Sequence, residues 1–126
     1  MPNSPPRPVF LNLLRIHLPA TALVSFAHRV AGVLLALLIP LLLYLLQLSL
    51  RDAAGFAQAR QMLQGSVMRV ALIIPLWALL HHLLAGVRFL LIDRGIGLHK
   101  TTARQSAMLV AVSALLMALL IAALLR

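Results

Sequence analysis

The stretch VLLALLIPLLLYLL, residues 33–46, decides the fold. It has no charged side chain and lies inside a largely apolar segment that extends from residue 21 to residue 50. Roughly 20 helical residues cross a bilayer core about 30 Å thick. Two more segments of this kind lie at residues 67–92 and 106–125. The sequence therefore predicts an all-α membrane protein, with residues 1–126 forming a single bundle of three transmembrane helices.

The composition agrees with a membrane location and excludes several other classes. Hydrophobic residues make up 63% of the 126 residues and charged residues only 10%, too few to cover a soluble core. The formal net charge of +9 comes from cations in short flanks between apolar runs, which suits lipid headgroups better than nucleic acid. With no cysteine, the chain has no disulfide, no cysteine-ligated zinc and no iron–sulfur cluster of its own.

The distribution of cations predicts the orientation. One side of the predicted bundle carries Arg7, Arg15, Arg29, Arg88, Arg94, Lys100 and Arg104, and the other carries Arg51, Arg60, Arg69 and Arg126. The excess on the first side predicts a cytoplasmic N-terminus. Residues 1–8 are Pro-rich, predict an extended arm, and lack the pattern of a secretory signal or transit peptide. The simplest expectation is a bacterial inner-membrane protein inserted by its own helices.

Two prolines and one connecting segment add local expectations. Pro40 and Pro75 lie inside the first and second spans, where each removes a backbone donor and is expected to kink its helix. Residues 53–64 (AAGFAQARQMLQ) are expected to form a short helix at the membrane interface.

Polar residues interrupt the first span in the sequence SFAHRVAG, residues 25–32. On a helix, Ser25, Arg29 and Gly32 share a face, with His28 beside them. One interpretation is a cationic flank whose arginine reaches the headgroups. The other is a polar pocket for an anionic or carbonyl-bearing ligand. The residues alone leave both open.

The second span contains HHLLAGVR, residues 81–88. His82 lies about 9 Å deeper than Arg88 at 1.5 Å per residue, and ionisable groups at that depth are costly. Gly86 lies one turn from His82 on the same face, which leaves room for a flat macrocycle, so the pattern is compatible with a b-type haem ligated by neutral imidazole. A histidine hydrogen-bonded to another helix fits equally well.

The predicted topology brings the two clusters to one membrane face. The first span enters from the side to which the second returns, so Ser25 and His28 should lie near the level of His82. Haem propionates are anions that prefer cationic partners at an interface, and His28, Arg29 and Arg88 could supply them.

The order of these motifs resembles a known family. Arg7-Pro8-Val9, then S-x-x-H-R-x-x-G at residues 25–32, then H-x-x-x-G-x-R at residues 82–88, followed by Asp93, is similar to the cytochrome b subunit of succinate dehydrogenase. The similarity extends over nearly the whole chain in span number, loop length and motif order. The two longer motifs are fairly specific as a pair.

The resemblance implies a role in a four-subunit complex. A flavoprotein oxidises succinate, an iron–sulfur subunit relays electrons, and two membrane anchors bind haem b and reduce ubiquinone. His82 would be one axial ligand of the haem iron, with His81 the second choice, and the other ligand would come from the smaller anchor. Ser25 and Arg29 would line the quinone pocket, and His28 would face a propionate. A hydroxyl can donate to a quinone carbonyl, and a fixed cation favours the anions formed on reduction.

Two positions depart from the family pattern. Phe89 stands where the family often has histidine, and Ala31 where it commonly has serine or threonine.

The implied function is an anchor and electron-transfer subunit that is not catalytic alone. A closely related alternative is the anchor of a fumarate reductase. The others are a small transporter component, with the histidines as relays, and a structural assembly factor.

Overall fold

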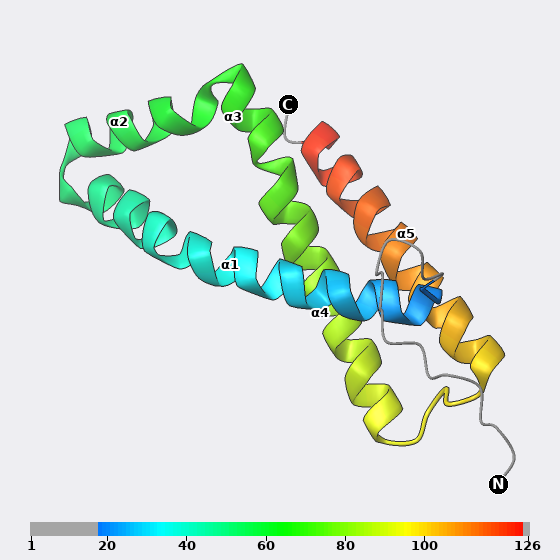
Figure 1. Cartoon of the computed structure of the whole chain (residues 1–126). Helices are drawn as coiled ribbons and strands as arrows, with labels where there is room; N and C mark the ends of the chain where they lie inside the picture. Colours follow the sequence, from blue (N-terminus) through cyan, green and yellow to red (C-terminus); the bar gives the residue numbers. More distant parts are fainter. Residues whose placement is uncertain (1–17, 125–126) are drawn as a thin grey trace, which may run out of the picture.

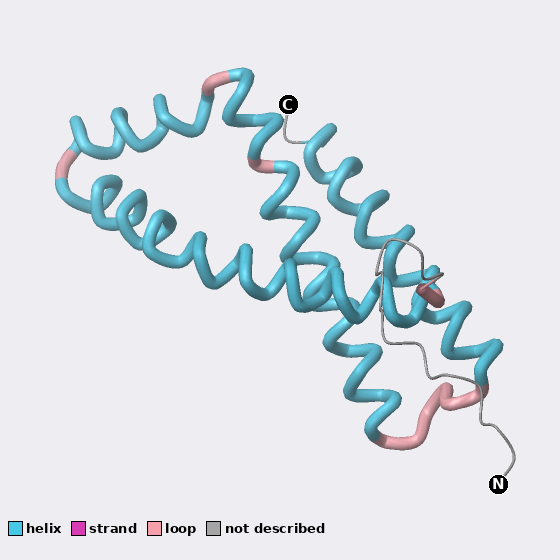
Figure 2. Tube along the Cα trace, in the orientation of Figure 1, coloured by secondary structure: helices cyan, strands magenta, loops and turns pink. Residues whose placement is uncertain are grey.

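The computed structural model describes residues 18–124 as helices joined by short loops (Figures 1 and 2). The helices are α1 (Ala20–Arg51), α2 (Ala53–Gln64), α3 (Ser66–Ala71), α4 (Ile73–Asp93) and α5 (Lys100–Leu124), and the described residues include no strand. Three segments are long and apolar enough to cross a membrane: Ala20–Arg51, Ser66–Asp93 and Lys100–Leu124. These segments confirm the predicted all-α fold with three spans. The predicted N-terminal arm at residues 1–8 lies outside the described residues.

The long apolar segments of the structure overlap all three predicted spans, whose exact bounds in a membrane stay predictions. The third helix begins at Lys100, well before the expected residue 106. Its first turns are polar (KTTARQ) and therefore do not register as apolar sequence, yet they continue the helix. The expected end at residue 125 falls outside the described residues.

The helices form an open arrangement built around α4. Helices α4 and α5 pack side by side in opposite directions, and α1 crosses both of them near its N-terminal end (Figure 1). After Arg51 the chain turns, and α2 packs back against α1 (Figure 1). The N-terminal end of α1, the C-terminal half of α4 and the start of α5 therefore lie together. The polar clusters of the first two spans meet in this region.

Small side chains allow the close approach of α4 and α5. The fully buried positions on these helices are mostly alanines: Ala78, Ala85, Ala107, Ala114 and Ala118. Small residues are typical of helix contacts in membranes, where backbone proximity and van der Waals packing drive association. Most leucines and valines of the spans are exposed in this chain, as expected for surfaces that face lipid or other subunits.

The two prolines have different effects. Pro40 lies within α1, and the helix continues without a break on both sides. In the second span the helix is interrupted at Leu72, three residues before Pro75. Pro75 has no N–H to pair with the carbonyl of Ala71, and its ring crowds that carbonyl, so the interruption falls where the missing hydrogen bond predicts.

Between α4 and α5 the chain reverses through Gly95 and Gly97, whose φ angles of +83° and +80° favour glycine.

The expected connecting helix at residues 53–64 is present as α2. Asp52 caps it by accepting a hydrogen bond from the backbone N–H of Gly55 at 2.6 Å. That bond, with a smaller contribution from Arg51, lowers the pKa of Asp52. Because this pKa lies below its ordinary value, the Asp52 carboxylate is ionised at neutral pH. The stability that its capping hydrogen bond contributes is lost only in acid, when the carboxylate is protonated. Whether α2 lies in a membrane interface stays a prediction.

Helix α2 contacts α1 through a residue that has no room for a side chain. Gly55 is buried, and a Cβ at this position would collide with the backbone carbonyl oxygen of Leu48 on α1. A backbone oxygen cannot turn aside as a side chain can. The glycine therefore sets the distance between the two helices.

Replacing Gly55 with alanine is expected to destabilise the α1–α2 contact by about 1–3 kcal/mol, because the new methyl group overpacks it. Gly65→Ala is the matched control, since the nearest side-chain atom would be Met68 Cβ at 4.0 Å. Thermal unfolding and limited proteolysis in the α2 region would measure the difference. Equal melting temperatures and cleavage rates for the two variants would contradict the packing argument.

Candidate functional site

His82 projects from α4 toward α1 at the point where these helices cross. Its Nδ1 lies 3.1 Å from the backbone carbonyl oxygen of His28. A carbonyl only accepts, so this contact requires that Nδ1 carries the proton and donates. Gly32 lies beside the same ring, and a Cβ there would come within 2.9 Å of His82 Cε1. The missing side chain at Gly32 therefore lets the imidazole approach the backbone of α1.

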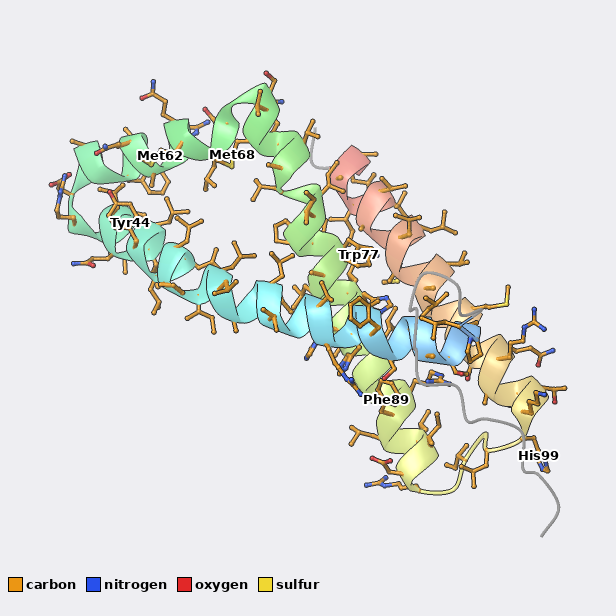
Figure 3. All side chains as sticks on the ribbon, viewed as in Figure 1. Tyr44, Met62, Met68, Trp77, Phe89 and His99 are labelled. Atoms are coloured by element: carbon orange, nitrogen blue, oxygen red, sulfur yellow. The ribbon has the colours of Figure 1, made fainter. Side chains whose placement is uncertain are left out.

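The ring of His28 covers the next part of the same surface of α4. It stacks on the ring of His82, with centroids 4.1 Å apart and planes 11° from parallel. It also lies 5.3 Å from the ring of Phe89 (labelled in Figure 3). A Cβ at Gly86 would meet His28 Nε2 at 3.7 Å, so His28 fills the space above that glycine. His28 Nε2 is buried without a hydrogen-bond partner among the described residues.

The neighbouring histidine has different surroundings. His81 is only 2% exposed, and both of its ring nitrogens are buried without a partner within residues 18–124. Its ring stacks on Trp77, one turn earlier on α4, at 5.3 Å and 26° (Trp77 is labelled in Figure 3). Adjacent residues on a helix point about 100° apart, so His81 and His82 lie on different faces of α4.

The two environments differ in their fitness to ligate iron. A metal-binding histidine commonly donates its second ring N–H to a carbonyl or carboxylate, which fixes the tautomer and the ring orientation. His82 has that arrangement: Nδ1 is engaged by the His28 carbonyl, the side chain is partly exposed, and Nε2 is not among the enclosed nitrogens. His81 is enclosed by its own chain. The residues present therefore fit an axial ligand at His82.

Ser25 and Arg29 lie on α1, one turn apart, at the same end of the bundle as His28. Ser25 is half-buried and Arg29 is exposed. Arg29 lies at one end of a shallow groove along α1, with Val30, Val33, Leu34 and Leu37. A cation beside an apolar groove suits a ligand with a polar head and a hydrocarbon tail. Arg29 is accessible from outside this chain and Ser25 only partly so, and Ser25 does not line this groove.

Arg88 faces α5 rather than the histidines. It is only 6% exposed, and its guanidinium donates from Nε to Ser106 Oγ and from Nη2 to the carbonyl oxygen of Ala103, both at 3.0 Å. The guanidinium carbon also lies 5.5 Å from the centroid of the Phe89 ring. Arg88 thus joins the end of α4 to the start of α5. Sequence reasoning did not identify Ser106 as its partner, because a lone serine at the start of an apolar span gives no distinctive signal.

Comparisons with known proteins point in one direction. Residues 3–123 match the family described as "Succinate dehydrogenase/Fumarate reductase transmembrane subunit". The chain is 40% identical over 90 residues to a succinate dehydrogenase cytochrome b556 subunit of Coxiella burnetii (strain RSA 493 / Nine Mile phase I), covering 71% of this chain and 72% of that protein. It is 30% identical over 118 residues to the subunit of the same name from Paracoccus denitrificans, covering 94% and 91%.

Proposed function

Because the chain belongs to the succinate dehydrogenase/fumarate reductase transmembrane subunit family, we propose that it is the haem- and quinone-binding anchor of a succinate:quinone oxidoreductase. The family and its relatives support a cytochrome b membrane anchor of succinate dehydrogenase. Three apolar helices agree with a multi-pass membrane subunit. The chain by itself is not expected to oxidise succinate; that chemistry belongs to partner subunits.

The proposed cofactor is haem b, with His82 as the axial ligand that this chain supplies. The observation that carries the assignment is the hydrogen bond that His82 Nδ1 donates to the His28 carbonyl. With the proton on Nδ1, the lone pair of Nε2 is free to bind iron. When bound, the haem supplies one-electron transfer close to the quinone site. The second axial ligand would come from the smaller anchor subunit. His81 remains the second choice, because both of its ring nitrogens are buried by this chain and could not reach iron without rearrangement.

The propionates of this haem are proposed to contact His28, Arg29 and Arg88. His28 has the strongest geometric support, because its ring stacks at 4.1 Å on the ring of the proposed ligand His82. Its Nε2 lacks a hydrogen-bond partner among the described residues but is enclosed over Gly86, so it would have to turn outward to donate to a propionate. Arg29 is exposed at the same end of α1. Arg88 is the least supported, since two of its N–H groups are engaged by α5. We expect its main contribution to be holding α4 and α5 together.

Ubiquinone is the proposed substrate of this membrane site, with Ser25 and Arg29 as its contacts. The Ser25 hydroxyl would donate to a quinone carbonyl, and the Arg29 guanidinium would stabilise the negative charge that develops on reduction. The groove along α1 beside Arg29 would accept part of the hydrocarbon tail. Both residues would hold and polarise the quinone head while electrons arrive from the partner subunits.

The proposed setting is a four-subunit complex in a bacterial inner membrane. The partners would be a flavoprotein, an iron–sulfur subunit and a second small anchor, with the N-terminus in the cytoplasm as the positive-inside bias predicts. The anchor of a fumarate reductase is the alternative within the same family. It would use the same residues with electrons flowing from quinol to fumarate.

Co-expression with the neighbouring genes and affinity purification through this chain would test the assignment to a complex. The expected result is co-purification of a flavoprotein and an iron–sulfur protein, with succinate-dependent reduction of ubiquinone in detergent. A chain that purifies alone and supports solute uptake in vesicles would contradict the proposal and favour a transporter component. Much faster fumarate reduction by a low-potential quinol than succinate oxidation would favour the fumarate reductase alternative.

A further inference from the structure

We propose that one turn of α1, from His28 to Gly32, is the positioning element that sets the orientation of the haem ligand His82. The inference rests on the proposed function of His82 as an axial ligand and extends it to two positions on another helix. The backbone carbonyl of His28 fixes the tautomer and rotation of the imidazole, and Gly32 provides the space that this hydrogen bond requires.

The carbonyl of His28 holds the ring by its Nδ1 edge. The 3.1 Å contact joins residues 54 positions apart in the chain, so it directly ties α1 to α4. In a continuous helix the same carbonyl also pairs with the N–H of Gly32, and its two lone pairs allow both bonds. A main-chain acceptor inside a helix has little freedom to move. The ring orientation of His82 is therefore set by the position of α1.

Gly32 makes that approach possible. A Cβ at this position would lie 2.9 Å from His82 Cε1 and 3.3 Å from Nδ1, closer than carbon atoms ordinarily pack. The ring would have to move away from α1, which would stretch or break its bond to the His28 carbonyl. The His28 ring, stacked 4.1 Å from the His82 ring, restricts movement in one direction. A single methyl group at Gly32 should therefore turn the ligand plane.

This arrangement places two functions on one helix. Helix α1 carries the proposed quinone contacts Ser25 and Arg29, and the turn from His28 to Gly32, which includes Arg29, carries the groups that orient His82. The contacts that align the haem ligand thus lie next to the contacts that hold the substrate.

The test is Gly32→Ala in the purified four-subunit complex. The EPR g-values of a low-spin ferric haem depend on the orientation of its two axial ring planes, so they report the ligand directly and independently of activity. We expect Gly32→Ala to shift the g-values and the haem midpoint potential. The matched control is Gly65→Ala, whose Cβ meets nothing nearer than 4.0 Å and which should leave both unchanged. Haem content is measured in parallel by its pyridine complex.

Loss of haem from a fully assembled Gly32→Ala complex, with full haem in Gly65→Ala, would agree with a displaced ligand. If the added methyl group instead prevents assembly, a double variant tests the cause. If the clash with the His82 ring is the cause, Gly32→Ala combined with His82→Ala should assemble as well as His82→Ala alone, because the obstructing ring is gone. A Gly32→Ala complex with full haem and wild-type g-values would overturn the proposal. So would an assembly defect that the double variant does not relieve.

The outcomes separate this inference from the proposed function. A wild-type complex without haem, or a His82→Ala complex with its haem intact, would remove the axial ligand assignment itself. An intact His82 assignment combined with an unperturbed Gly32→Ala haem would remove only the positioning role.

Discussion

Replacing His82 with alanine is expected to eliminate the b-type haem band from the reduced-minus-oxidised spectrum of the assembled complex. Alanine has no atom that can bind iron. Within residues 18–124, no other histidine has one ring nitrogen hydrogen-bonded to a carbonyl and the other free. Loss even of a supporting contact around a metal ligand commonly costs 10–100-fold in affinity, and loss of the ligand itself should cost more.

His81→Phe is the control for this experiment. Phenylalanine keeps a ring next to Trp77 and removes two nitrogens that are buried without partners, a change that is often neutral or stabilising. The haem band should therefore persist in His81→Phe. A band that survives in His82→Ala and disappears in His81→Phe would transfer the ligand assignment to His81.

Replacing Arg29 with leucine is expected to lower succinate-dependent ubiquinone reduction by about 10- to 100-fold. Hydrogen bonds to charged groups contribute about 1.5–3 kcal/mol, and each 1.4 kcal/mol corresponds to about a tenfold change in rate. Ser25→Ala should have a smaller effect in the same direction, since a neutral hydrogen bond contributes about 0.5–1.5 kcal/mol. Succinate oxidation by an artificial soluble acceptor should remain largely unchanged in both variants, because that reaction bypasses the membrane site.

Arg69→Leu is the matched control for Arg29→Leu. Arg69 is an exposed cation on α3, at the opposite end of the bundle, where its Nε donates to the carbonyl of Gln64. Its replacement should leave quinone reduction intact. Equal loss of quinone reduction and of soluble-acceptor activity in Arg29→Leu would indicate failed assembly, and full quinone reduction would contradict a role for Arg29 in the pocket.

The three spans could be predicted because their signal is composition. Apolar stretches of the required length dominate the chain, and the long apolar segments Ala20–Arg51 and Ser66–Asp93 each extend one residue beyond the predicted spans at both ends. Helix α5 begins at Lys100, six residues before the predicted third span, because its polar first residues continue the helix beyond the apolar sequence that hydropathy detects. The span bounds themselves stay predictions. The break at Leu72 follows from Pro75, although Pro40 left α1 continuous.

The candidate site could be located but not assembled from the sequence. The i and i+4 spacing of His82 and Gly86 correctly placed them on one face of a helix. The space over Gly86 is filled by the ring of His28, a contact that depends on how α1 crosses and rotates against α4. The same holds for Gly32 against His82 and for Arg88 against Ser106. Periodicity gives the face of one helix, whereas these contacts need the relative placement of two.

The most direct test of the central claim is the redox difference spectrum of the complete complex, purified through this chain after co-expression with its neighbouring genes. A haem-binding anchor predicts a b-type band in stoichiometric amount, together with a co-purifying flavoprotein and iron–sulfur subunit. A complex that contains both soluble subunits and reduces ubiquinone but shows no haem band would contradict the role assigned to His82.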